Sequence, residues 1–159
     1  MENRKYRILF VCTGNICRSP TAEGIMKDLL KKHSLEKQIE VDSAGTHGWH
    51  KGEQPDFRSV ACARGFGIDI SKLKSRPLVD KDFSDFDLII AMDNKNINDL
   101  CRFASKSEVT SQIHKLLEYA PTYGEDVPDP YYKDNFDYVY EMIESACENL
   151  LQDIKKNIL

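Results

Sequence analysis

Three features are missing from this 159-residue sequence, and each absence argues against a class of protein. No apolar run approaches the roughly 20 residues that a membrane-spanning helix requires. The first residues, Met1 to Arg7, are polar and contain no apolar core of a secretory signal. The formal net charge is −4, whereas proteins that bind nucleic acids usually carry a basic stripe. We therefore expect a cytoplasmic protein that neither spans a membrane nor binds nucleic acid.

Paired cysteine motifs and cysteine–histidine clusters are also absent, which argues against a structural zinc site. An odd number of cysteines without a secretory signal is typical of a reducing compartment, where thiols stay free. A chain of this length buries enough core to fold without disulfides or metals, and we predict no cofactor. We expect the last three of the five cysteines to be buried in helices; the five are Cys12, Cys17, Cys62, Cys101 and Cys147.

Strand-like and helix-like segments alternate along the chain. We predict strands at 6–11, 39–44 and 86–92, helices at 19–33, 56–64, 94–103 and 136–156, a short strand or helical turn at 113–117, and a long loop at 119–134. Alternation of this kind predicts a single α/β domain over residues 1–159, with a parallel sheet and helices on both faces. Ligands of such sheets bind at the carboxyl ends of the strands.

The segment 12–20 (CTGNICRSP) joins the first predicted strand directly to the first predicted helix. Backbone N–H groups in such a loop, together with the helix dipole, favour binding of a phosphate-like anion. Gly14 and Asn15 tolerate the positive φ that a tight cradle needs, and Arg18 offers a planar fork for two phosphoryl oxygens.

Within the helix that follows, we expect Ser19 to be the N-cap residue, with Pro20 at the first helical position and Glu23 near the positive end of the dipole.

Cys12 lies at the mouth of this predicted anion site. The field that attracts a phosphate also stabilises a thiolate, which is positioned to attack phosphorus and form a covalent thiophosphate. The hydroxyl of Ser19 is then available to stabilise the sulfur when it leaves. The alternative is a buried structural cysteine near a turn, since free cysteines are often buried.

The segment 126–132 (DVPDPYY) is the best candidate for the general acid that cleavage of a phosphate ester needs. Prolines on both sides of Asp129 stiffen the backbone, and Tyr131 and Tyr132 are suited to form an aromatic wall. The chemistry alone does not distinguish Asp129 from Asp126, and a rigid surface turn with an ordinary aspartate is the alternative interpretation.

Residues 11–20 together with 129–131 resemble the low-molecular-weight protein tyrosine phosphatases, and so do the segments 42–45 (DSAG) and 91–93 (AMD). The resemblance extends over nearly the whole chain. It implies a small flavodoxin-like, three-layer α/β fold with a four-stranded parallel sheet. It also implies hydrolysis of phosphotyrosine and small aryl phosphates through a cysteinyl-phosphate intermediate, without a cofactor.

The resemblance further implies roles for individual residues. Cys12 would be the nucleophile, Arg18 the phosphate binder, and Asp129 the general acid and later the base. Ser43 would support the loop, with Asn15 holding its strained shape. The substrate-binding residues would be Thr13, Gly14, Asn15, Ile16, Cys17, Ser19, Trp49, Tyr131 and Tyr132. The partners would be phosphotyrosine-containing proteins or peptides, with phosphate or another oxyanion in the loop.

Three details refine this expectation. In similar enzymes a bulky aliphatic residue at the position of Ile16 accompanies activity on phosphotyrosine, whereas threonine accompanies phosphoarginine. A reversible disulfide between Cys12 and Cys17 would protect the nucleophile from over-oxidation. Lys72 stands near a position where many relatives have a histidine that braces the loop, and its charge would favour acidic phosphopeptides.

Two other functions fit part of the pattern. An arsenate reductase on the same fold would also use Cys12 and Arg18, but it needs further redox cysteines in the middle of the chain, and residues 75–92 contain none. A catalytically silent phosphate-binding module usually loses the nucleophile or the acid, whereas candidates for both are present here.

Overall fold

The computed structural model describes residues 4–159; residues 1–3, which belong to the predicted domain and to its polar start, lie outside the described part. The strands are β1 (Tyr6–Cys12), β2 (Ile39–Gly45), β3 (Leu88–Ala91) and β4 (Gln112–Lys115). The α-helices are α1 (Arg18–Lys32), α2 (Phe57–Gly65), α3 (Asp82–Asp85), α4 (Asn94–Ala104), α5 (Pro130–Lys133) and α6 (Phe136–Asn157). Two 3-10 helices, η1 (Leu116–Tyr119) and η2 (Pro121–Tyr123), follow β4.

The four strands form one parallel sheet in the order β2-β1-β3-β4. The central strand β1 pairs with β2 as far as Cys12 and Gly45, and with β3 as far as Val11 and Ala91. The carboxyl ends of β1, β2 and β3 therefore lie side by side. This arrangement confirms the predicted four-stranded parallel sheet, and it brings the loop after β1 next to the segments that follow β2 and β3.

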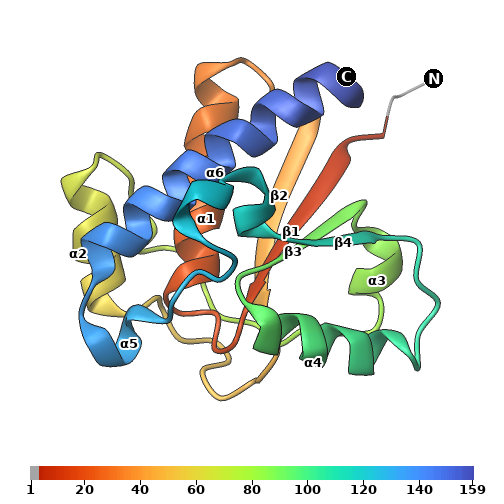
Figure 1. The fold of residues 1–159 in the computed structure, drawn as a ribbon, viewed down its shortest axis with the longest axis horizontal. Helices are drawn as coiled ribbons and strands as arrows, with labels where there is room; N and C mark the ends of the chain where they lie inside the picture. Colours follow the sequence, from red (N-terminus) through yellow and green to blue (C-terminus); the bar gives the residue numbers. More distant parts are fainter. Residues whose placement is uncertain (1–3) are drawn as a thin grey trace.

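Side chains of β1 alternate between two hydrophobic cores, as expected for a strand with both faces covered. Ile8 and Phe10 belong to one core with residues of α1 and α6, and Leu9 and Val11 belong to the other with residues of α3 and α4. Figure 1 shows the sheet between these two layers. The three-layer α/β architecture predicted from the sequence is therefore confirmed.

The start of α1 differs from the prediction. The helix begins at Arg18 with Cys17 as the N-cap residue, and no side chain caps it. The prediction that Ser19 is the N-cap was therefore wrong, because the hydroxyl of Ser19 contacts Cys12 and Asn15 instead. Glu23 was expected near the positive end of the dipole, but it lies in the second turn and is buried.

The bounds of other helices and strands also differ from the predicted ones. The strand predicted at 86–92 is limited to β3, the segment 113–117 divides between β4 and η1, and the predicted loop at 119–134 contains η2 and α5. The short helix α3 was not predicted. Of the three cysteines expected to be buried in helices, Cys147 is buried and Cys62 partly so, whereas Cys101 is exposed on α4, so the prediction was wrong there.

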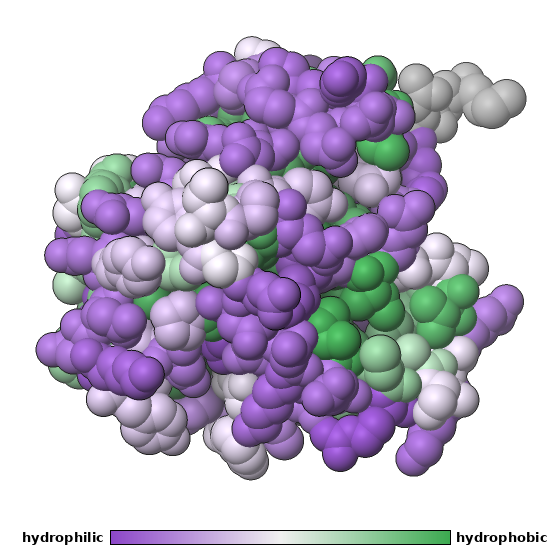
Figure 2. All heavy atoms as spheres, in the orientation of Figure 1, coloured by the Kyte–Doolittle hydropathy of each residue, from purple (hydrophilic) through white to green (hydrophobic). Residues whose placement is uncertain are grey.

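The surface in the orientation of Figure 1 is largely hydrophilic, with a hydrophobic patch near α3 and α4 (Figure 2). Within residues 4–159, no helix combines the length and the apolar character that a membrane crossing requires.

Candidate active site

The loop between β1 and α1, residues 13–17, is held from outside by three other segments of the chain. Backbone N–H groups of Thr46, His47 and Asp56 and the hydroxyl of Ser75 donate hydrogen bonds of 2.8–3.0 Å to carbonyl oxygens in the stretch from β1 into the loop. These carbonyl oxygens therefore point towards the segments that hold the loop.

The backbone N–H groups of residues 14–17 donate no hydrogen bond to any group in the described part of the chain. They lie where the positive end of the α1 dipole meets the end of a strand. Unpaired N–H groups in such a position attract anions, because both the donors and the dipole favour negative charge. The loop has the chemistry of a phosphate cradle.

Asn15 supports the loop through the hydrogen bonds of its buried side chain. It is 2% exposed and has a positive φ of 58°. Its Oδ1 accepts the backbone N–H of Arg76 at 3.0 Å, and its Nδ2 donates to Ser19 Oγ at 2.8 Å and to Ser43 Oγ at 3.0 Å. A backbone N–H can only donate, so it fixes which way the amide points. Ser43 Oγ in turn donates to the buried carboxylate of Glu23 at 2.6 Å.

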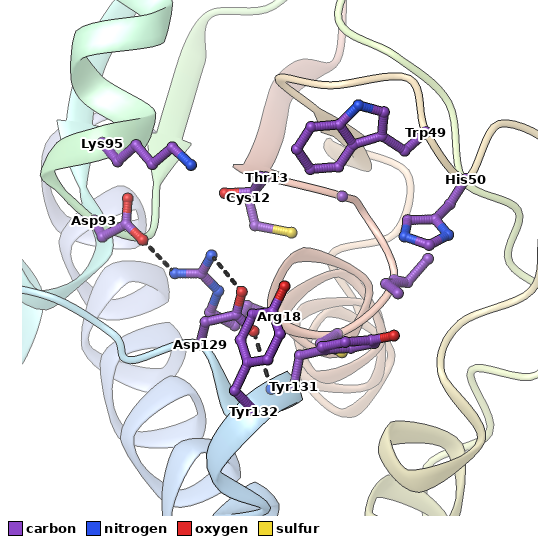
Figure 3. Close-up of a pocket in the computed structure, with 13 residues that line it drawn as sticks. Cys12, Thr13, Arg18, Trp49, His50, Asp93, Lys95, Asp129, Tyr131 and Tyr132 are labelled. Carbon is purple, nitrogen blue, oxygen red and sulfur yellow. Dashed lines mark hydrogen bonds and ion pairs between the residues drawn. The ribbon is translucent and has the colours of Figure 1, made fainter.

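This network decides what Ser19 does for Cys12. The hydroxyl oxygen of Ser19 already accepts the hydrogen bond from Asn15, so its own hydrogen is free to point at Cys12 Sγ, 2.9 Å away. Such a donor stabilises negative charge on sulfur. Cys12 is 3% exposed, and Figure 3 shows its sulfur pointing into the middle of the pocket.

Arg18 lies beside this sulfur and is 2% exposed. Its Nη1 donates to Asp93 Oδ2 at 2.6 Å and to the carbonyl oxygen of Val127 at 2.9 Å. Its Nη2 lies 3.7 Å from Asp129 Oδ2 (Figure 3). Burial lowers the pKa of Arg18, but the negative charges of Cys12 and Asp93 outweigh burial and leave this pKa above its usual value. The guanidinium therefore stays charged.

The surroundings of Asp129 and Asp126 distinguish these two candidates for the general acid. Asp129 is the N-cap residue of α5, where its Oδ1 accepts the N–H of Tyr131 at 3.0 Å. Its side chain is 39% exposed and lines the pocket. Asp126 does not line the pocket, and its Oδ1 lies 2.9 Å from Lys115 Nζ. Of the two candidates, only Asp129 faces Arg18.

Aromatic side chains form the walls of the pocket, which has a volume of about 350 Å³. Trp49 stacks on His47 with ring centroids 4.3 Å apart. The guanidinium of Arg58 lies 5.3 Å from the ring centroid of Tyr131. The lining residues are Cys12, Thr13, Gly14, Ile16, Cys17, Arg18, Trp49, His50, Asp93, Lys95, Asp129, Tyr131 and Tyr132.

Most of the residues singled out in the sequence thus lie together. Asn15, Ser19 and Ser43 do not line the pocket and form the buried network beneath the loop. No group of three or more His, Cys, Asp or Glu side chains suited to hold a metal ion occurs within residues 4–159.

A model of the family described as low molecular weight phosphotyrosine protein phosphatase matches residues 7–158. The chain belongs to this family. The low molecular weight protein-tyrosine-phosphatase YfkJ of Bacillus subtilis is 46% identical over 150 residues, which cover 94% of this chain and 96% of the relative. This finding confirms the resemblance carried by the loop motif and by the Asp-Pro-Tyr segment.

Solved structures of three similar proteins share this fold. The crystal structure of YfkJ from Bacillus subtilis matches with a TM-score of 0.93 at 43% identity and covers 100% of both chains. A protein tyrosine phosphatase from Entamoeba histolytica matches with a TM-score of 0.89 at 38% identity, covering 98% of this chain and 100% of that chain. The Drosophila arginine phosphatase matches with a TM-score of 0.88 at 36% identity, covering 94% of this chain and 98% of that chain.

Several residues of this phosphatase site were not assigned from the sequence. His50, Asp93 and Lys95 line the pocket. Ser75, rather than the exposed Lys72, supplies a side-chain hydrogen bond that braces the loop. Asp93 had a usable signal, because it directly follows a strand at the edge of the sheet where ligands bind. Ser75 had none, since it lies in a loop whose path depends on the folded structure.

Proposed function

We propose that this protein hydrolyses phosphotyrosine in proteins and peptides, and small aryl phosphates, through a cysteinyl-phosphate intermediate. One observation carries the proposal. The sulfur of Cys12 faces a pocket that also contains the unpaired N–H groups of the loop, the guanidinium of Arg18 and the carboxyl group of Asp129.

In the first step the N–H groups of the loop and Arg18 bind the phosphoryl oxygens. A lone pair of the Cys12 sulfur forms a bond to phosphorus, and the bond between phosphorus and the tyrosyl oxygen breaks. The electron pair of that bond goes to the tyrosyl oxygen, which takes a proton from Asp129. Preorganised donors around the developing charge lower the barrier, because they need no reorganisation at the moment of reaction.

In the second step Asp129, now a carboxylate, removes a proton from a water molecule. The water oxygen forms a bond to phosphorus, and the bond between phosphorus and sulfur breaks. The electron pair returns to the Cys12 sulfur, where the hydroxyl of Ser19 stabilises it. Phosphate leaves, and the enzyme is restored with Asp129 protonated.

The walls of the pocket suit a flat aromatic group. Ile16 provides an aliphatic side chain at the mouth of the loop, and Trp49, Tyr131 and Tyr132 surround the opening. The Drosophila relative is named an arginine phosphatase, so phosphoarginine is the second candidate substrate. Phosphotyrosine is favoured here, because the loop carries a bulky aliphatic residue at Ile16 rather than threonine.

The deciding experiment measures hydrolysis of a phosphotyrosyl peptide, under reducing conditions and without added metal, for the native protein and three variants. Cys12→Ser is expected to abolish activity. Asp129→Asn keeps the shape and the helix cap but removes the acid, and kcat is expected to fall roughly 10²- to 10⁴-fold. Asp126→Asn is the matched control and should retain native activity.

Other outcomes point elsewhere. Full activity in Asp129→Asn with loss in Asp126→Asn would move the acid role to Asp126. Higher activity on phosphoarginine than on phosphotyrosine would reassign the substrate. A native protein that hydrolyses neither, but supports thiol-coupled reduction of arsenate, would be a reductase on this fold; one that only binds phosphate would be a silent module.

The proposal extends to the whole chain and its location. Residues 1–159 are proposed to act as one catalytic domain, a choice supported by a family match over residues 7–158. A cytoplasmic location is proposed because the described cysteines are all free thiols and a cysteine nucleophile needs a reducing environment.

A further inference from the structure

Three side chains that can carry positive charge line the pocket, and two of them have carboxylate partners. Arg18 pairs with Asp93 and Asp129, and His50 pairs with Glu53. Within residues 4–159, no carboxylate lies within 4.0 Å of the ammonium of the third, Lys95, although its side chain is part of the pocket wall.

The position of Lys95 in its helix makes this unpaired charge more notable. Lys95 is the second residue of α4, and a positive side chain in the first turn opposes the positive end of the helix dipole. The carboxylate one turn further along, Asp99, pairs with Arg102 instead. Lys95 therefore opposes the helix dipole without a compensating ion pair within residues 4–159, and such a local cost is expected at a functional site.

The location of Lys95 indicates what it binds. Figure 3 shows its side chain extending from α4 over the pocket, on the side of Asp93 and across from His50 and Tyr131. The phosphoryl group is already served by the unpaired N–H groups of the loop and by Arg18, which is 2% exposed. Lys95 is exposed and lines the pocket, so its ammonium is accessible to the part of a substrate that lies outside the loop.

We propose that Lys95 is a specificity-determining residue, which selects phosphotyrosyl peptides that carry Asp or Glu beside the phosphotyrosine. This inference rests on the proposed phosphatase function. It moves the preference for acidic peptides away from Lys72, which is exposed but does not line the pocket. The negative peptide side chain completes the missing ion pair of Lys95 in the bound state.

The test compares kcat/KM for three substrates: a phosphotyrosyl peptide with flanking Asp and Glu, the same peptide with Asn and Gln, and a small aryl phosphate. Lys95→Met removes the charge and keeps most of the aliphatic stem, and Lys72→Met is the matched control. The native protein and Lys72→Met should prefer the acidic peptide roughly two- to fivefold, as expected for an exposed ion pair. Lys95→Met should lose that preference through a higher KM for the acidic peptide, with a smaller change on the neutral peptide and the aryl phosphate.

Salt and charge reversal sharpen the test. The preference of the native protein should shrink towards unity at about 0.5 M salt, because exposed charges are then screened, and Lys95→Glu should favour the neutral peptide. The proposal is overturned if Lys95→Met keeps the native preference. It is also overturned if this variant loses activity equally on all three substrates, since Lys95 would then act on the phosphoryl group. Failure of the proposed function itself looks different, because the native protein would hydrolyse none of the three.

Discussion

Asn15 is the residue whose replacement tests the phosphate loop most directly. Its positive φ of 58° is unfavourable for most residues with a Cβ, although Asn tolerates it better than Ala, and its buried amide makes three hydrogen bonds. Asn15→Ala removes the hydrogen bonds and keeps the strain, whereas Asn15→Gly removes the same hydrogen bonds and relieves the strain. The two variants together separate the network from the backbone conformation.

The expected magnitudes follow from these contacts. Three hydrogen bonds at about 1 kcal/mol each predict a loss of about 3 kcal/mol in the free energy of unfolding for Asn15→Gly. A residue with a Cβ in the left-handed region costs about 1–2 kcal/mol, partly offset by the greater freedom of glycine in the unfolded chain. Asn15→Ala should therefore be about 1 kcal/mol less stable than Asn15→Gly.

Urea unfolding followed by circular dichroism measures both values, and kcat is measured on an aryl phosphate. Both variants should lose kcat, because Ser19 no longer receives the hydrogen bond that directs its hydroxyl towards the Cys12 sulfur. A glycine variant no more stable than the alanine variant would refute the argument from strain. Native kcat in either variant would refute the argument that the network orients Ser19.

Two further predictions concern pH. Burial raises the pKa of Asp56, but hydrogen bonds from the side chain and backbone of Arg58 outweigh burial and hold it below its usual value of 3.8. This stabilisation is present above the unfolded-state pKa and is lost as the pH falls through the lower folded-state pKa. Asp56→Asn should therefore be less stable than the native protein at neutral pH, by up to about 1 kcal/mol for a partly exposed ion pair. In urea unfolding this difference should close as the pH falls below 3.8, and a difference that persists in acid would contradict the reasoning. Burial also raises the pKa of Cys17 to about 12, so little of its thiol is ionised at neutral pH. After mild peroxide the Cys17 sulfur should attack a sulfenic acid on Cys12, forming a disulfide and releasing water. This reaction should be faster at about pH 9 than at pH 7, because more thiolate is present. Mass spectrometry that finds a sulfinic acid on Cys12 and no disulfide at either pH would contradict this.

Much of the fold could be predicted from the sequence, because β1 and β3 are short apolar runs and the long helix α6 has a regularly spaced apolar face. The loop chemistry was readable for a different reason: Cys12 and Arg18 belong to one short segment, so their proximity needs no knowledge of the tertiary structure. From its chemistry alone Asp129 was one of two candidates, and the resemblance to the family selected it. What separates it from Asp126 is the ion pair of Asp126 with Lys115, which forms between a loop and the end of β4 that meet only in the folded chain.

The order of the strands in the sheet places the residues that were not predicted at the site. Asp93 and Lys95 follow β3, and they lie beside the loop after β1 because β3 pairs with β1. The sequence predicts a parallel sheet but not which strands are neighbours. Gly45 illustrates the same limit. The sequence predicts only that it ends a strand, whereas in the structure a Cβ at this position would lie 2.8 Å from the carbonyl oxygen of Thr13, which is too close.

The helix cap was predicted wrongly at Ser19 because two uses compete for one hydroxyl. A serine before an apolar helix usually accepts a backbone N–H, and here it accepts from Asn15 and faces the Cys12 sulfur. The first N–H groups of α1 are left without a side-chain cap. An uncapped start is unfavourable for the helix, but it leaves the donors and the dipole available to an anion.

The contacts of Arg18 show how one guanidinium serves two carboxylates with different tasks. Nη1 has two hydrogens, and both are used, by Asp93 at 2.6 Å and by the carbonyl oxygen of Val127 at 2.9 Å. The Nε and Nη2 edge remains for two phosphoryl oxygens, which is the geometry that a bidentate contact requires. Asp93 therefore orients the fork. Asp129 lies 3.7 Å from Arg18 and is 39% exposed, so the proposed mechanism requires only that it turn from Arg18 to the oxygen of the leaving group once a phosphate occupies that edge.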